Sequence, residues 1–101
     1  MNYRVEIPPY VENQILDQAL YIARDSVEQA LLWADGIQSK IKGLGEMPHA
    51  SSVDTDASVR AGHEVRRRAI GNYLVFYFVD EENGVVVMEG FRHGARQPGT
   101  D

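Results

Sequence analysis

The fold is decided by one stretch in the second half of the chain, residues 64–96, which reads EVRRRAIGNYLVFYFVDEENGVVVMEGFRHGAR. Its pairs Gly71-Asn72 and Asn83-Gly84 are of the kind found in two-residue hairpin turns, because Gly and Asn tolerate the positive φ that such turns need. The stretch predicts three strands joined as an antiparallel meander, at residues 64–70, 73–80 and 85–91. The middle strand is apolar on both faces, so we expect it to be central and at least partly covered on both sides.

The first of these strands carries three consecutive arginines. Because side chains alternate across a strand, neighbouring arginines should project to opposite faces of the sheet. The expected sets are Val65, Arg67 and Ala69 on one face, and Arg66, Arg68 and Ile70 on the other.

The residues before this stretch predict one strand and two helices. Apolar and charged residues alternate from 3 to 7, as in a half-buried strand, and Pro8-Pro9 ends it. Apolar residues then recur at helical spacing from 10 to 24 and again as far as about 44, with Asp25 or Ser26 as the cap of the second helix. So short a link predicts an antiparallel helix hairpin, and the helical spacing of Trp33 places it in the core.

Between the hairpin and the meander, residues 49–62 are mostly small and polar without a clear period, so we expect a loop there. The whole chain, 1–101, then reads as one α+β domain with the order β-α-α-β-β-β, and residues 97–101 as a flexible tail. The helix hairpin packs on one face of a mainly antiparallel four-stranded sheet. A single hairpin leaves apolar surface on such a sheet exposed, which is typical of a partner-binding site.

Charge is distributed unevenly along the chain. The 101 residues carry a formal net charge of −5 at pH 7, which argues against a protein basic enough to coat nucleic acid. Residues 1–59 contain four basic and nine acidic residues, whereas residues 60–96 contain six arginines and five acidic residues. The arginines gather at the two ends of the predicted meander, so we expect a local positive patch whose field extends only about 8 Å at physiological salt.

The residue content excludes several kinds of site. The chain has no cysteine, which removes disulfides, thiolate metal sites and cysteine nucleophiles. Its histidines, His49, His63 and His93, lack the short spacing of a zinc site, and two aspartates in the 49–62 segment are too few for a calcium loop. No apolar run approaches a membrane span and the first residues lack the apolar core of a signal peptide, so we expect a cytoplasmic protein without metal or cofactor.

Two longer stretches are similar to the RelE/ParE superfamily of toxins from bacterial toxin–antitoxin modules, a group also labelled plasmid stabilisation proteins. Residues 18–48, QALYIARDSVEQALLWADGIQSKIKGLGEMP, resemble the family's helix hairpin, with an aromatic-Ile-Ala turn, an Ala-rich second helix and a Leu before a Pro. Residues 66–96 resemble its signature of an arginine, a short turn, a Tyr-x-x-x-Tyr strand, an acidic turn, a Val-rich strand and a His-Gly-x-Arg ending. The resemblance covers nearly the whole chain.

The resemblance implies one of two activities, each neutralised by a cognate antitoxin that wraps an extended or helical segment around the toxin. ParE-like members inhibit DNA gyrase, and RelE-like members cut messenger RNA in the A site of the ribosome. The RelE-like pattern adds lysines on the sheet and an aromatic or histidine-aromatic ending, whereas this chain has no lysine after Lys42 and ends in QPGTD. The comparison favours a ParE-like gyrase inhibitor without chemistry of its own, in a hetero-oligomer with its antitoxin. A RelE-like nuclease and a non-toxic homologue that only binds a partner are the alternatives.

These alternatives give two sets of candidate site residues. A metal-free ribonuclease needs cations for the developing phosphorane charge and groups that transfer protons. The candidates for those roles are Arg66, Arg68, Arg92, His93 and Arg96, with Arg67 as a further cation and Glu64 as a second proton-transfer group. The candidates for binding the target or the antitoxin are Arg66, Arg67, Arg68, Tyr73, Tyr77, Arg92 and Arg96.

Each of these residues also has a structural interpretation. Alternating arginines can protect a sheet edge, or pair with Glu89 or Asp80 across the sheet. The histidine before Gly94 can be a turn residue that bonds its own backbone, and the two tyrosines can belong to the core.

Overall fold

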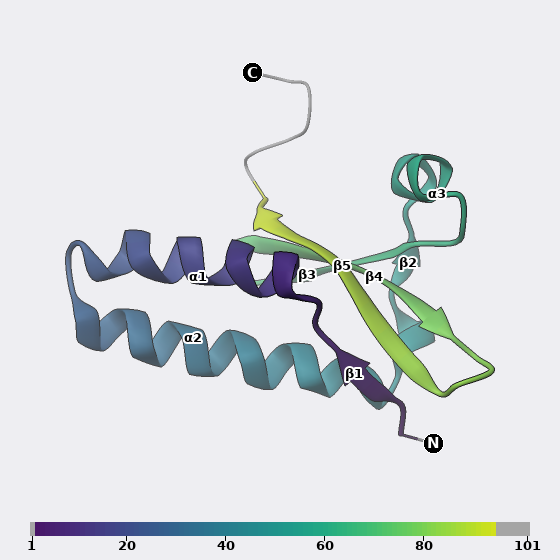
Figure 1. Ribbon diagram of the computed structural model, residues 1–101, viewed down its shortest axis with the longest axis horizontal. Coiled ribbons are helices and arrows are strands. Elements are labelled where there is room, and N and C mark those ends of the chain that lie inside the picture. Colours follow the sequence, from purple (N-terminus) through teal and green to yellow (C-terminus); the bar gives the residue numbers. More distant parts are fainter. Residues whose placement is uncertain (1, 95–101) are drawn as a thin grey trace.

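The computed structural model describes residues 2–94, which form a sheet with a helix hairpin packed against it (Figure 1). In chain order the helices and strands are β1 (Arg4–Glu6), α1 (Pro9–Ala23), α2 (Val27–Lys42), β2 (Ser52–Val53), α3 (Thr55–Ala61), β3 (Arg66–Ile70), β4 (Tyr73–Asp80) and β5 (Val85–His93). Two short 3-10 turns, Gly43–Gly45 and Pro48–Ala50, lie between α2 and β2.

The strands of the sheet lie in the order β1-β5-β4-β3-β2. β1 runs parallel to β5, and the other neighbours are antiparallel. This arrangement confirms the α+β class and the antiparallel meander. It also confirms that the two helices follow the first strand and precede the meander. The expected four strands are corrected to five, because β2 adds a two-residue edge strand beside β3.

The helix hairpin begins and turns at the residues that the sequence indicated. α1 starts at the second of two prolines, which the first turn of a helix tolerates since its N–H groups need no intrahelical partner. α2 is capped by Ser26, whose hydroxyl accepts a hydrogen bond from the Gln29 N–H at 3.1 Å. Of the two expected cap residues, Ser26 rather than Asp25 therefore has this role.

The hairpin covers one face of the sheet, which we call the helix face. Buried residues of both layers form one core there: Val11, Ile15, Ile37, Ile41 and Leu44 with Ile70, Val75, Tyr77, Val86, Met88 and Phe91. The half-buried ring of Trp33 packs against this core, with its centroid 5.3 Å from Tyr73 and 5.9 Å from Phe91. Full burial of such apolar side chains stabilises a fold by about 1.5–3 kcal/mol each.

The opposite face of the sheet, which we call the open face, carries Leu74, Phe76 and Phe78 of β4. These residues alternate with the buried Val75 and Tyr77 and are half-buried. The middle strand is thus covered on the helix face and partly covered on the open face, as its apolar sequence indicated.

The segment 49–62, expected to be a loop, contains β2 and α3 instead. Asp54 caps α3 by accepting a hydrogen bond from the Ala57 N–H at 2.9 Å, and Gly62 ends the helix with a φ of +78°. The Ser58 hydroxyl ties α3 to the sheet, because it accepts the Val65 N–H at 2.8 Å. No residue of α3 is buried. Its sequence therefore does not need the apolar stripe by which the two longer helices were recognised.

The two turns of the meander differ from one another. Gly71-Asn72 is the expected two-residue turn, with Gly71 at a φ of +60° between the paired residues Ile70 and Tyr73. The second turn is longer than expected, because Asp80 pairs with Val85 and residues 81–84 form the loop. The carboxylate of Asp80 holds this loop by accepting hydrogen bonds from the backbone N–H and the side-chain amide of Asn83, at 3.2 and 2.8 Å.

Candidate functional site

The arginines of β3 divide between the two faces of the sheet, as their alternation predicts. Arg66 and Arg68 lie opposite Tyr77 and Val75 and so project to the helix face. Arg67 lies opposite Phe76 and projects to the open face.

The two arginines on the helix face bind the protein's own chain. Arg66 donates to the carbonyl oxygens of Ser51 and His49, at 2.6 and 3.2 Å, and to the carboxylate of Glu64 at 3.2 Å. Arg68 donates from Nε to the buried Ser51 hydroxyl at 2.6 Å. Through these bonds the Arg66 guanidinium supports residues 49–51. Only 16% of the Arg66 side chain is exposed, so it presents little charge to solvent.

Arg67 is more accessible, with 49% of its side chain exposed. Its Nη1 lies 3.6 Å from a carboxylate oxygen of Asp54, the residue that caps α3. The Asp54 side chain is only 16% exposed, so the pair joins a half-exposed guanidinium to a mostly buried carboxylate across a long 3.6 Å contact.

The two candidate tyrosines occupy different environments on the helix face. Tyr77 is 0% exposed, and its hydroxyl donates to the Pro48 carbonyl oxygen at 2.7 Å, so it is a core residue with no surface of its own. Tyr73 is half-buried in an aromatic cluster, stacked on Phe91 at a centroid distance of 5.2 Å. The His93 ring meets Tyr73 edge-on at 5.3 Å.

Arg92 projects to the open face, away from His93. It lies opposite Leu74 in the register, and its guanidinium carbon is 5.2 Å from the centroid of the Phe76 ring. Arg96 lies outside the described residues. The nuclease candidates are therefore divided, with Arg66, Arg68 and His93 on the helix face and Arg92 on the open face.

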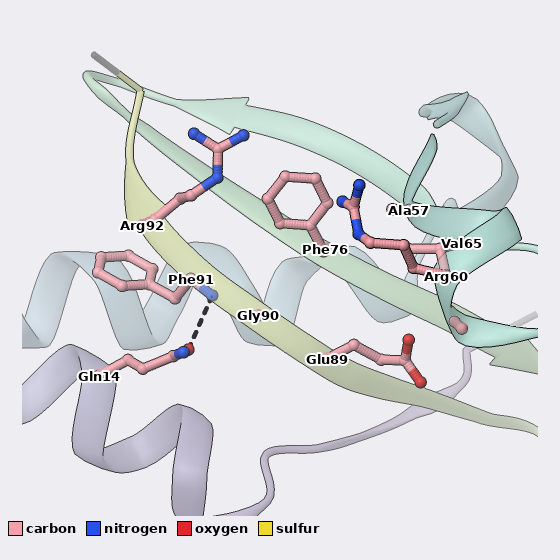
Figure 2. A pocket seen from close by; sticks show the side chains of 10 residues that line it. Gln14, Ala57, Arg60, Val65, Phe76, Glu89, Gly90, Phe91 and Arg92 are labelled. Carbon is pink, nitrogen blue, oxygen red and sulfur yellow. Dashed lines mark hydrogen bonds between the residues drawn. The ribbon is translucent and has the colours of Figure 1, made fainter. Parts of the chain in front are cut away.

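A hollow of about 350 Å³ lies on the open face between α3 and strands β4 and β5 (Figure 2). Phe76 lines it, and Figure 2 shows the guanidinium groups of Arg60 and Arg92 flanking the ring. Gly90 is the register partner of Phe76, and a Cβ there would lie 3.6 Å from the ring. The absence of a side chain at Gly90 therefore leaves this part of the aromatic surface uncovered.

A histidine holds the α3 end of this hollow to the sheet. The His63 ring lies 4.5 Å from the Phe78 ring, and its Nε2 donates to a Glu89 carboxylate oxygen at 2.9 Å. Arg60, His63 and Phe76 were not among the residues expected from the sequence. The sequence signal that could have revealed α3 is its pair of capping residues, since Asp54 begins this short helix and Gly62 ends it.

A second hollow, of about 340 Å³, continues along β5 toward α1. The two hollows share Gln14, Phe91 and Arg92 in their walls. The Phe91 N–H points out of the sheet at this edge and donates to the Gln14 side-chain oxygen at 3.0 Å (Figure 2). Together the hollows form an elongated groove, which we call the β5 groove.

A polar cluster lies at the other end of the sheet, beside the loop that follows β4. Glu81 accepts hydrogen bonds from the Tyr3 hydroxyl at 2.6 Å and from His49 Nε2 at 2.8 Å. The Tyr3 hydrogen bond, followed by the bond and charge of His49, lowers the pKa of Glu81. The same hydrogen bond raises the pKa of Tyr3. No group of three or more metal-ligating side chains occurs within residues 2–94.

The sheet with one helix hairpin is the fold that the resemblance to the toxin family implied. A family model described as ParE toxin of type II toxin-antitoxin system, parDE, matches residues 5–98, so the chain belongs to the ParE toxin family. A comparison with individual curated proteins gave no match. The family makes this chain the toxin of a type II toxin–antitoxin system and gives it an antitoxin as partner. Within the described part of the chain, no helix is long and apolar enough to cross a membrane.

Proposed function

We propose that this toxin acts by binding DNA gyrase and blocking it through protein–protein contact, without bond chemistry of its own. The observation that carries the proposal is the division of the nuclease candidates between two faces of the sheet. Stabilising a phosphorane requires cations and a proton-transfer group around one phosphate, with donors within about 3 Å of its oxygens. Arg66 and Arg68 are instead bound to residues 49–51, and Arg92 lies on the opposite face from His93.

The charge of the chain supports the same conclusion. A ribosome-dependent nuclease must approach a polyanion, and a protein with a net charge of −5 is repelled by it at long range. Gyrase offers protein surface, for which a local basic patch on an acidic chain is sufficient. Gyrase acts on chromosomal DNA, so the proposal includes a cytoplasmic location.

A supercoiling assay tests the proposal directly. Purified toxin at micromolar concentration should inhibit supercoiling of relaxed plasmid by gyrase, and an equimolar amount of antitoxin should restore it. Full supercoiling in the presence of free, folded toxin would rule the proposal out.

A toeprinting assay on a translating template separates the RelE-like alternative. We expect no new cleavage sites in the messenger RNA. New cuts that disappear in Arg68→Ala or His93→Ala would establish the nuclease instead. If the toxin neither inhibits supercoiling nor produces new cuts, and its overexpression leaves growth normal, the chain is a homologue that only binds its partner.

A further inference from the structure

We propose that the toxin binds a nucleoside monophosphate between α2 and the β3–β4 turn, with the base against Trp33 and the phosphate at Lys40 and Arg68. This site shares no lining residue with the two hollows of the β5 groove. The inference concerns the toxin alone, so a failure of the gyrase proposal would leave it standing.

Two adjoining hollows form the site, which we call the α2 hollow. The first, of about 240 Å³, is lined by Trp33 and Tyr73, and the second, of about 340 Å³, is lined by Arg68. Lys40 and Gly71 belong to the walls of both, so the two hollows are continuous. Together they are within the range of roughly 300–1,000 Å³ that is usual for sites of small molecules.

A glycine in the middle of α2 points to an external ligand. Gly36 destabilises the helix by about 0.5–1 kcal/mol relative to alanine, yet a Cβ at this position would meet no atom within 4 Å. The packing of the protein itself therefore does not require the missing side chain. Trp33, Gly36 and Lys40 are spaced i, i+3 and i+7 and line the same hollow, so the bare backbone leaves room beside the indole ring.

The indole ring offers a platform for a planar base. Trp33 is half-buried and is held in place by the rings of Tyr73 and Phe91, at 5.3 and 5.9 Å between centroids. Stacking of a base on such a side chain is worth about 1–3 kcal/mol. Asn72 lines the same hollow, and its amide can both donate to and accept from the polar edge of a base.

The charges of the α2 hollow select an anion. No acidic residue lines either part, although the net charge of the chain is −5, whereas Glu89 and Asp17 line the β5 groove. Lys40 makes no hydrogen bond or ion pair through its side chain within residues 2–94. Arg68 is positioned by the 2.6 Å bond from its Nε to Ser51, which leaves the Nη atoms of its guanidinium for a phosphate.

A single nucleotide fits this charge better than a nucleic acid does. One phosphate carries a charge of about −1.5 to −2 at pH 7, which Lys40 and Arg68 together balance. A nucleic acid adds a charge at every further step, and the acidic remainder of the protein would repel those charges.

Trp33 is the one tryptophan of the chain, so its fluorescence reports on the site directly. Purified toxin is titrated with adenosine, guanosine, cytidine and uridine monophosphates, and isothermal titration calorimetry gives each affinity independently. We expect at least one monophosphate to quench Trp33 and to bind. The matching nucleoside and inorganic phosphate should each bind at least about tenfold more weakly, because each lacks one half of the contacts.

Two variants place the ligand. Lys40→Glu should weaken binding at least about tenfold, because a carboxylate then faces the phosphate. Lys42→Glu is the matched control, since Lys42 lies in the same last turn of α2 but lines neither hollow, and it should change the affinity by no more than about twofold. Gly36→Leu should also abolish binding, because its side chain fills the hollow, while urea unfolding shows a fold at least as stable as wild type.

Three results would overturn the inference. The first is that none of the four monophosphates binds, and the second is that inorganic phosphate alone binds as tightly as they do. The third is that a short single-stranded RNA without a terminal phosphate binds at least about tenfold more tightly than the monophosphates, which would assign the site to nucleic acid. Equal loss of affinity in Lys40→Glu and Lys42→Glu would likewise refute the placement of the phosphate.

Discussion

The Tyr77 hydroxyl donates a hydrogen bond of 2.7 Å to the carbonyl oxygen of Pro48, and it does so in a site with no solvent exposure. Tyr77 is at the centre of β4, whereas Pro48 is in the 3-10 turn that follows the helix hairpin. This single bond joins the two layers of the fold where the chain passes from the hairpin toward the sheet edge.

Tyr77→Phe should therefore destabilise the protein by about 1–2 kcal/mol, because a buried carbonyl oxygen loses its donor while the packing is kept. Urea unfolding measures the change. Tyr73→Phe is the control, since the Tyr73 hydroxyl makes no hydrogen bond within the described residues, and its effect should be close to zero. Equal losses in both variants would contradict a specific role for the Pro48 bond.

Arg66→Ala should cost about 1.5–3 kcal/mol, because a charged donor is removed from two backbone carbonyl oxygens. Arg67→Ala, on the next residue, should cost less, about 1 kcal/mol, since Arg67 is half exposed and its one contact is a long ion pair of 3.6 Å with Asp54. Urea unfolding of both variants decides between these roles. A larger loss of stability in Arg67→Ala than in Arg66→Ala would contradict a supporting role of Arg66 for residues 49–51.

Glycine substitutions should change stability in opposite directions at two positions that both have free space around them. Gly62→Ala should lower the stability by about 1 kcal/mol, because residue 62 ends α3 at a φ of +78°. Gly36→Ala, in the middle of α2, should raise it by about 0.5–1 kcal/mol. Thermal unfolding midpoints measure both shifts, and a stabilising Gly62→Ala would mean that α3 does not end as described.

Acid should weaken the fold partly through Glu81. A carboxyl group whose pKa is lowered in the folded state contributes stability above its unfolded pKa, here near 4.5, and loses that contribution as the pH falls through the folded pKa. Glu81→Gln should therefore flatten the loss of stability as the pH falls below the ordinary pKa of a glutamate, and Tyr3→Phe should do so in part, because its hydroxyl is the main cause of the lowered pKa. Urea unfolding at several pH values measures this, with Glu82→Gln in the same loop as control. An acid limb as steep in Glu81→Gln as in wild type would refute the assignment.

Local patterns were sufficient to predict the helix hairpin and the meander, because their apolar periods are set by burial on one face. The same alternation correctly divided Arg66 and Arg68 from Arg67. The alternation could not predict which group each arginine contacts. Arg68 and Ser51, for example, are brought together only by the pairing of β2 with β3. α3 was missed because it buries no residue. Arg60, which lies on α3 and borders the open-face hollow, was missed with it.

The pairing of β1 with β5 joins residues about 80 positions apart, as in the register of Arg4 with Val85. During synthesis β1 must therefore wait, without its strand partner, until nearly all of the described chain has left the ribosome. Contacts between such distant residues slow folding, because a long loop has to close before they form. The complete sheet is thus formed late, since its first strand is paired only after its last strand has been synthesised.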